Sequence, residues 1–223
     1  MNDAIEHRIG SAPDREGYWP LEPQSWTEAE FYDLVEVVHD LVSRPRYGTY
    51  HSYGNCGWHY SEFAVDPAQI LYRWTVNRIF ERCALPLRLA KTGEDTGRLV
   101  QVAGDDRDRL AEMSAEHTTG ADTDLIAHAI ALYRSRDSGR EAKRSACVAL
   151  FGILETHRDL LKAELLSKDE GALFTIANNF QVRHRRADQH GEYDDAYLDW
   201  IFWWTLATVE LTNQLLQRQD IAP

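Results

Sequence analysis

The stretch ALFTIANNFQVRHRRADQ, residues 172–189, is central to the fold and to the chemistry of this chain. Apolar residues recur through its first half at helical spacing, which predicts a helix that Asp169 can cap and that packs one face on a core. Its second half holds Arg183, Arg185 and Arg186, in a chain whose formal net charge is −12. A basic cluster at the end of an apolar helix in an acidic chain predicts a functional site.

The sequence after residue 121 has helical character throughout. Helices are expected over 122–136, over 140–166, from Asp169 through the opening stretch, and over 196–217. Because short breaks separate them, the sequence predicts an up-and-down four-helix bundle that occupies 122–223.

The sequence before residue 104 mixes helix and strand. A capping box at Thr27 and Glu30 predicts a helix over 27–43, and Asp66 followed by Pro67 predicts the start of a second helix that runs to residue 84. The other expected segments are an irregular N-terminal arm over 1–24, a long loop over 44–66, a β-hairpin formed by 85–90 and 98–102, and a polar linker over 104–121 in which one short helix is possible. The expected fold class is therefore mainly α, with a small α/β unit over 25–103 that contains the hairpin, followed by the bundle.

Composition and charge exclude several classes of protein. A hydrophobic fraction of 43% is that of an ordinary globular chain, and the acidic balance argues against non-specific coating of nucleic acid. The three cysteines are widely spaced and the N-terminus lacks the apolar core of a signal peptide, so a cytoplasmic protein is expected. The longest apolar run, 200–207, is too short for a membrane span.

The sequence predicts no metal and no cofactor. His51, Cys56 and His59 lie close together in the expected loop, but they are too few and match no common zinc spacing. A loop packed by its own aromatic side chains is the simpler interpretation.

Arg183 and His190 form the candidate catalytic pair. An imidazole can accept a proton at neutral pH, and an arginine can bind a phosphate and stabilise charge in the transition state. Asn179 lies one helical turn before Arg183 on the same side, while His184 continues the apolar stripe and is either a core residue or part of the site. Spacing alone also pairs Arg44 with His51, so position between two late helices is what distinguishes Arg183.

The stretches LFTIANNFQVRH and YLDWIFWW, with Arg183 and His190 between them, resemble the HEPN superfamily of helical-bundle proteins over about 122–217. The resemblance implies a dimeric, metal-independent endoribonuclease of toxin or phage-defence type, in which His190 activates a ribose 2′-hydroxyl and Arg183 binds the adjacent phosphate. It also implies RNA or a nucleotide as ligand, and an antitoxin protein as a candidate partner. Some HEPN-like proteins only bind nucleotides or proteins, so a non-catalytic dimer module is the alternative.

Two further surfaces are candidates for binding. Arg140, Lys143 and Arg144 could extend an RNA-binding groove toward Arg183, Arg185 and Arg186, or form a solvated helix start. The last helix carries aromatics on more than one face, which predicts a homodimer interface that includes Trp200, Trp203 and Trp204. A purely structural role, in which the arginine cluster complements the helix dipole, remains the third interpretation.

Overall fold

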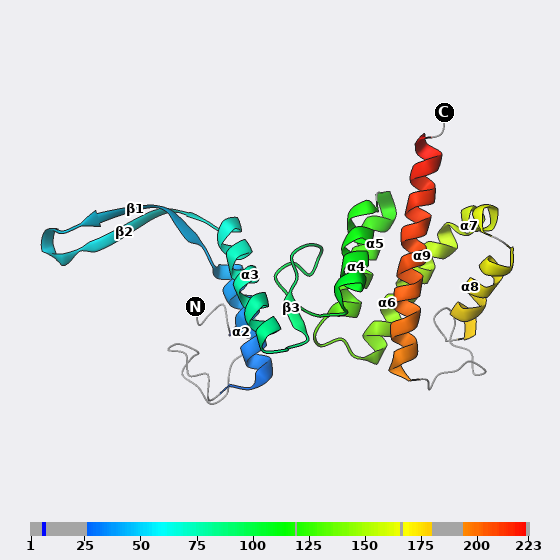
Figure 1. Cartoon of the computed structure of the whole chain (residues 1–223), viewed down its shortest axis with the longest axis horizontal. Helices are drawn as coiled ribbons and strands as arrows, with labels where there is room; N and C mark the ends of the chain where they lie inside the picture. Colours follow the sequence, from blue (N-terminus) through cyan, green and yellow to red (C-terminus); the bar gives the residue numbers. More distant parts are fainter. Residues whose placement is uncertain (1–5, 8–25, 119, 166, 180–193, 222–223) are drawn as a thin grey trace. The chain divides into compact units, whose positions relative to one another are not determined.

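The computed structural model describes residues 6–7, 26–118, 120–165, 167–179 and 194–221, and these are mainly helical (Figure 1). The chain divides into two compact units. The first comprises residues 1–91 and 95–100, and the second comprises 92–94 and 101–223. The predicted fold class is therefore confirmed at the level of a mainly α protein with a small β component.

Two helices form the centre of the first unit. α2 (Glu28–Leu41) begins with the predicted capping box, in which the Thr27 and Glu30 side chains each accept a hydrogen bond from the other residue's backbone N–H. α3 (Asp66–Arg82) has Pro67 in its first turn as expected, although Val65 is the N-cap and no side chain caps the helix. The helices bury a small apolar cluster of Val35, Val76, Phe80, Leu89 and Leu99.

A short sheet completes this cluster. β3 (Leu87–Leu89) pairs with β4 (Leu99–Gln101), which confirms the predicted pairing with shorter strands. Side chains from the helices complete the strands' hydrogen bonding: the Asn77 amide bonds both backbone groups of Leu89, and the Glu36 carboxylate accepts a hydrogen bond from the Leu99 N–H. Helix and strand are thereby held together by buried polar contacts as well as by apolar packing.

The prediction of a long loop over 44–66 is wrong. This stretch forms β1 (Arg44–His51) and β2 (Gly57–Ala64), an antiparallel hairpin in which Tyr50 lies opposite Trp58. A short turn, η2 (Tyr53–Asn55), closes its tip with a left-handed Gly54. The alternating apolar pattern that predicts a half-buried strand is missing because nearly every side chain on both faces is exposed.

The second unit consists of helices. Its elements are α4 (Asp105–His117), η3 (Gly120–Asp122), α5 (Thr123–Arg134), α6 (Arg140–Thr156), α7 (Arg158–Glu164), α8 (Ser167–Asn179) and α9 (Asp195–Ile221). α4 and α6 each pack against both α5 and α9, so these four helices form a closed ring of contacts. α8 adds Leu173, Phe174 and Ala177 to the same core.

This arrangement differs from the expected bundle in two ways. The stretch expected to be a linker contains α4, whose Ala111 is buried in the core and whose Asp108 pairs with Arg134 at 3.6 Å. The helix expected over 140–166 is divided at His157 into α6 and α7. The sequence allowed a short helix in this stretch but did not predict that it packs in the core, because its first turns are mostly charged and therefore lack an apolar stripe.

No helix in the described parts of the chain is long and apolar enough to cross a bilayer.

His39 is a buried histidine at the C-terminal end of α2. Its Nε2 lies 2.8 Å from Arg73 Nη1, and its Nδ1 lies 3.3 Å from Asp40, which also pairs with Arg98 at 2.9 Å. Burial, assisted by the charges of Arg73 and Arg98, lowers the pKa of His39 in spite of its hydrogen bond with Asp40. The His39 ring is therefore neutral in the folded protein, and its Nε2 accepts a hydrogen bond from Arg73.

The stability of the first unit should fall as the pH drops below neutral. Unfolded His39 titrates near its usual pKa of about 6.5, so below that pH the unfolded chain binds a proton that the folded chain resists. Urea unfolding across a pH series should show this loss, and His39→Gln should remove that part of the pH dependence. The same substitution at the exposed His51 should leave it unchanged. An unaltered pH profile in His39→Gln would contradict the assignment.

Candidate functional site

The predicted catalytic segment connects the last two helices of the second unit. Arg183, His184, Arg185, Arg186 and His190 all lie outside the described residues. α8 ends at Asn179, whose side chain also lies outside them, and α9 begins at Asp195. The structure therefore describes the helices on either side of the segment. The residues around the start of α9 form the part of the candidate site that the structure describes.

Arg140, Lys143 and Arg144 form a second basic patch, and its first residue contacts the start of α9. The Arg140 guanidinium, in the first turn of α6, donates a hydrogen bond to the Asp195 carboxylate. One turn further along α6, the Lys143 ammonium lies 5.3 Å from the centre of the Tyr133 ring. The fold thus brings Arg140 to the start of α9, where the predicted segment ends, and Lys143 to Tyr133 of α5.

The third member of the patch behaves differently. Arg144 keeps only 14% of its side chain exposed and lies 3.5 Å from Glu141 on its own helix. Its charge is therefore balanced within the unit. Arg140 is likewise paired with a carboxylate, that of Asp195, but keeps 35% of its side chain exposed.

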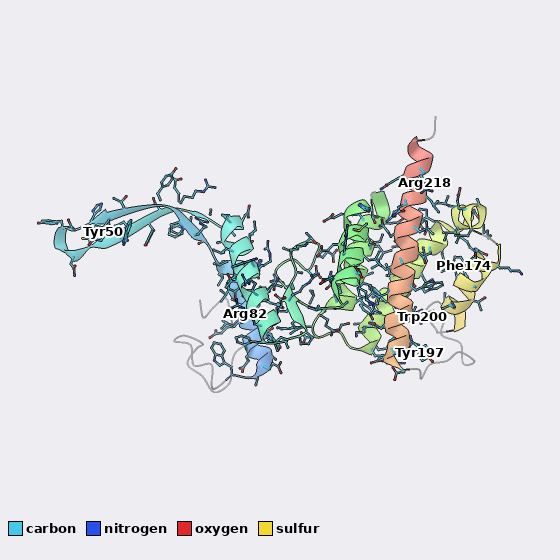
Figure 2. All side chains as sticks on the ribbon, in the orientation of Figure 1. Tyr50, Arg82, Phe174, Tyr197, Trp200 and Arg218 are labelled. Atoms are coloured by element: carbon cyan, nitrogen blue, oxygen red, sulfur yellow. The ribbon has the colours of Figure 1, made fainter. Side chains whose placement is uncertain are left out.

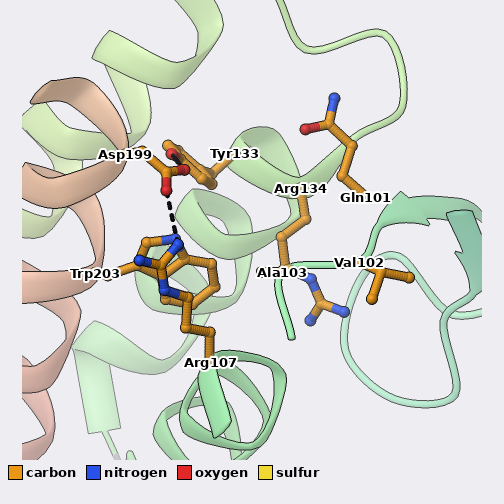
Figure 3. Close-up of a pocket in the computed structure, with 8 residues that line it drawn as sticks. All are labelled: Gln101, Val102, Ala103, Arg107, Tyr133, Arg134, Asp199 and Trp203. Carbon is orange, nitrogen blue, oxygen red and sulfur yellow. Dashed lines mark hydrogen bonds and ion pairs between the residues drawn. The ribbon is translucent and has the colours of Figure 1, made fainter. Parts of the chain in front are cut away.

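Asp199, one turn after Asp195, holds three helices together. It accepts a hydrogen bond of 2.5 Å from the Tyr133 hydroxyl of α5 and one of 2.7 Å from the Arg107 guanidinium of α4 (Figure 3). Because the two partners bond different carboxylate oxygens, both oxygens of Asp199 are engaged. The Tyr133 ring also stacks on Phe202 with ring centres 3.6 Å apart.

A pocket of about 200 Å³ lies beside this cluster. Its lining residues, drawn in Figure 3, are Gln101, Val102, Ala103, Arg107, Tyr133, Arg134, Asp199 and Trp203. The indole N–H of Trp203 is buried and has no hydrogen-bond partner among the described residues. Since ligand pockets usually exceed about 300 Å³, this one suits a small polar group with an acceptor atom for that indole.

The titratable groups here are poor proton-transfer catalysts. Burial, and then the hydrogen bond to Asp199, raises the pKa of Tyr133 well above its ordinary value, so the phenol stays protonated. Burial raises the pKa of the nearby Cys147 thiol to about 12, which removes it as a nucleophile at neutral pH. The pocket can bind and orient, while acid–base chemistry has to come from elsewhere.

The sequence prediction singled out none of these pocket contacts. The sequence feature that could have indicated these contacts is the spacing of Asp195, Asp199 and Trp203, which places all three on one face of α9. Acidic residues inside a strongly aromatic helix require a partner when they are partly buried. That partner, Arg107, belongs to α4, in the stretch that was expected to be a linker.

No group of three or more His, Cys, Asp or Glu residues within the described ranges could hold a metal ion. His51 and His59 do lie close on the hairpin, with ring centres 4.8 Å apart. Two imidazoles alone do not make a zinc site.

The three tryptophans expected at a dimer interface occupy different environments. Trp203 is buried, with 7% of its surface exposed, and belongs to the core of the second unit. Trp204 is partly buried against that core and stacks on Trp200. Trp200 is 46% exposed and is the member of the set that presents a large aromatic surface to solvent (Figure 2).

Comparison with known proteins yields no relative. No protein-family model matches this chain, and neither the curated proteins nor the solved structures give a match. The resemblance to the HEPN superfamily therefore depends on the segment 180–193 and the helices that flank it.

Replacing Asp199 should destabilise the second unit far more than replacing Asp195. Asp199→Ala removes the acceptor for both Tyr133 and Arg107, at a cost of about 2 kcal/mol or more. Asp195→Ala breaks one exposed ion pair, which contributes less than about 1 kcal/mol. Urea unfolding followed by far-UV circular dichroism measures both. Equal effects would contradict the central role given to Asp199.

Proposed function

We propose that this protein is a metal-independent endoribonuclease of toxin or phage-defence type, with a HEPN-like helical unit that carries Arg183 and His190. The observation that supports it most is the contact between Arg140 and Asp195. It brings one residue of the basic patch, Arg140, to the start of α9, and Lys143 follows Arg140 on α6.

The proposed reaction needs only the side chains of the chain and the substrate's own hydroxyl. His190 takes the proton from a ribose 2′-hydroxyl, and the oxygen forms a bond to the adjacent phosphorus. The bond from phosphorus to the 5′-oxygen breaks, and that oxygen leaves with the proton that the His190 imidazolium gives back, which returns His190 to its neutral form. The products are a 2′,3′-cyclic phosphate and a 5′-hydroxyl. Arg183 binds the phosphate and stabilises its additional negative charge.

The remaining predicted residues position the RNA in this proposal. Arg185 and Arg186 supply positive potential beside the reacting phosphate, while Asn179 and His184 contact the substrate. Arg140 and Lys143 bind phosphates further along the strand. The site is completed across a homodimer, and an antitoxin protein would act by covering it.

The second candidate function is a non-catalytic module that binds a nucleotide or protein. The pocket favours it, because Trp203 and Arg107 both line it and the buried indole N–H of Trp203 has no hydrogen-bond partner among the described residues. These two side chains could hold a small anionic or carbonyl group without any chemical step. In that case Arg183 would anchor a phosphate or carboxylate and His190 would have no proton to transfer.

Cleavage of a mixed RNA pool in EDTA should depend on both members of the pair. His190→Ala removes general-base catalysis and should lower the cleavage rate by about 10²–10⁴-fold, and Arg183→Ala should also reduce it severely. Matched controls in the same unit are the exposed His128→Ala and Arg109→Ala, which should cleave at the wild-type rate. If neither catalytic substitution changes cleavage, the assignment fails.

The second basic patch should contribute through Arg140 and Lys143 and not through Arg144. Replacing both Arg140 and Lys143 by alanine should weaken RNA binding and reduce the salt dependence of the affinity by about one counterion for each lost phosphate contact. Arg144→Ala is the control, because only 14% of its side chain is exposed, against 35% for Arg140. Titrations of a 2′-O-methyl RNA at several salt concentrations measure this. A reduced salt slope in Arg144→Ala alone would reverse the assignment.

A further inference from the structure

The hairpin of β1 and β2, here called the arm, exposes an unusual amount of aromatic surface. Six aromatic side chains on it each keep more than half of their surface in contact with solvent: Tyr47, Tyr50, Tyr53, Trp58, Tyr60 and Phe63. Together they leave on the order of 700 Å² of aromatic side chain in water. One partner of a standard protein interface buries about 800 Å². The face of the arm that carries Tyr50, Trp58 and Tyr60 could therefore supply part of an interface.

The arm's own contacts show an ordered surface. The Trp58 and Tyr60 rings are nearly parallel, at 9°, and both cover Gly48 on the opposite strand. A side chain at position 48 would lie 3.2 Å from the Tyr60 ring and 3.3 Å from Trp58. Tyr50 adds its edge to Trp58, with ring centres 5.6 Å apart. Figure 2 shows Tyr50 on the arm, away from α2 and α3.

Its composition is that of an interface core. From Arg44 to Ala64 the arm contains two arginines, one glutamate and no lysine or aspartate. Aromatic residues and arginine are enriched in the cores of protein interfaces, whereas lysine, glutamate and aspartate are depleted. In a chain of net charge −12, the arm is also a surface that can meet a copy of itself without strong repulsion between carboxylates.

The backbone of the arm favours one edge for pairing. A two-stranded hairpin is marginally stable alone, and its outer edges carry unpaired N–H and C=O groups. Pro45 removes one N–H from β1. β2 has no proline, and its left-handed residues, Gly57 and Glu62, leave Trp58 to Ser61 between them as regular strand. An antiparallel pair of β2 strands related by a two-fold axis would use the same edge on both copies.

We propose that two copies of this chain associate through their arms, with β2 of one copy pairing antiparallel to β2 of the other in a continuous four-stranded sheet. Pairing satisfies the exposed edge and covers part of the aromatic surface around Trp58 and Tyr60. This contact goes beyond the proposed function, since it needs no RNA and no catalytic residue. It also differs from the interface expected at Trp200.

Analytical ultracentrifugation over a wide range of concentrations tests the association. Wild type should be a reversible dimer, and Trp58→Ser with Tyr60→Ser should raise the dimer dissociation constant at least about tenfold. Trp74→Ser is the matched control, an exposed tryptophan on α3, and should leave the constant unchanged. A wild-type monomer at every concentration overturns the proposal, as does dissociation caused by Trp200→Ser alone.

Disulfide trapping locates the paired edge even if the double variant fails to fold. Cys56 and Cys83 are exposed and are first replaced by serine, while Cys147 is buried. Single cysteines then replace His59 and Ser61 on β2, or their cross-strand partners Thr49 and Tyr47 on β1. At least one β2 position should form a dimer under mild oxidation and neither β1 position should. Trapping at β1 only would overturn the assigned edge.

Single-stranded RNA is the competing ligand for an aromatic surface that also carries Arg44 and Arg46. Binding of a 2′-O-methyl oligonucleotide by the Trp58→Ser, Tyr60→Ser variant distinguishes the two. The proposed dimer contact leaves affinity at the wild-type value once dimer content is matched. A monomeric wild type whose RNA affinity falls with these substitutions would make the arm a nucleic-acid surface instead. Neither readout requires cleavage, so a failed ribonuclease assignment leaves both outcomes interpretable.

Discussion

The Asp199 carboxylate is the contact on which the helical unit most depends. It lies on α9, and its two oxygens bind Tyr133 of α5 and Arg107 of α4, so one partly buried anion sets the positions of three helices. The cation of Arg107 repays part of the cost of removing that anion from water. The same side of α9 begins with Asp195, which holds Arg140 and therefore the start of α6. The contacts of Asp199 beside the pocket and the contact of Arg140 with the start of α9 therefore both depend on acidic residues spaced one turn apart on a single helix.

Much of the fold could be predicted from sequence because it depends on local signals. The Thr27 and Glu30 capping box, Pro67 in the first turn of α3 and the apolar spacing in α5, α6 and α9 each leave a periodic or positional pattern. What escaped prediction has no such pattern. α4 has few apolar residues because its role is to supply Arg107 and Asp108 to other helices, and the arm has no alternation because neither of its faces is buried.

The candidate site could be predicted only as far as residue chemistry and chain position allow. Arg183 and His190 were chosen for what their side chains can do and for their place between the last two helices, and both lie outside the described residues. The contact of Arg140 with Asp195 joins residues far apart in the chain, so no local sequence pattern could predict it. Likewise, Trp203 and Trp200 look equivalent in sequence, and only the packing of α9 separates a core residue from an exposed one.

The central claim is that the chain cleaves RNA through the substrate's own 2′-hydroxyl. The most direct measurement uses one RNA substrate with a single 2′-deoxy substitution at the cleaved nucleotide, assayed in EDTA with analysis of the product ends. The account predicts a 2′,3′-cyclic phosphate and a 5′-hydroxyl from the unmodified RNA and no cleavage at the substituted position. Cleavage at that position, or products that end in a 3′-hydroxyl and a 5′-phosphate, would contradict it.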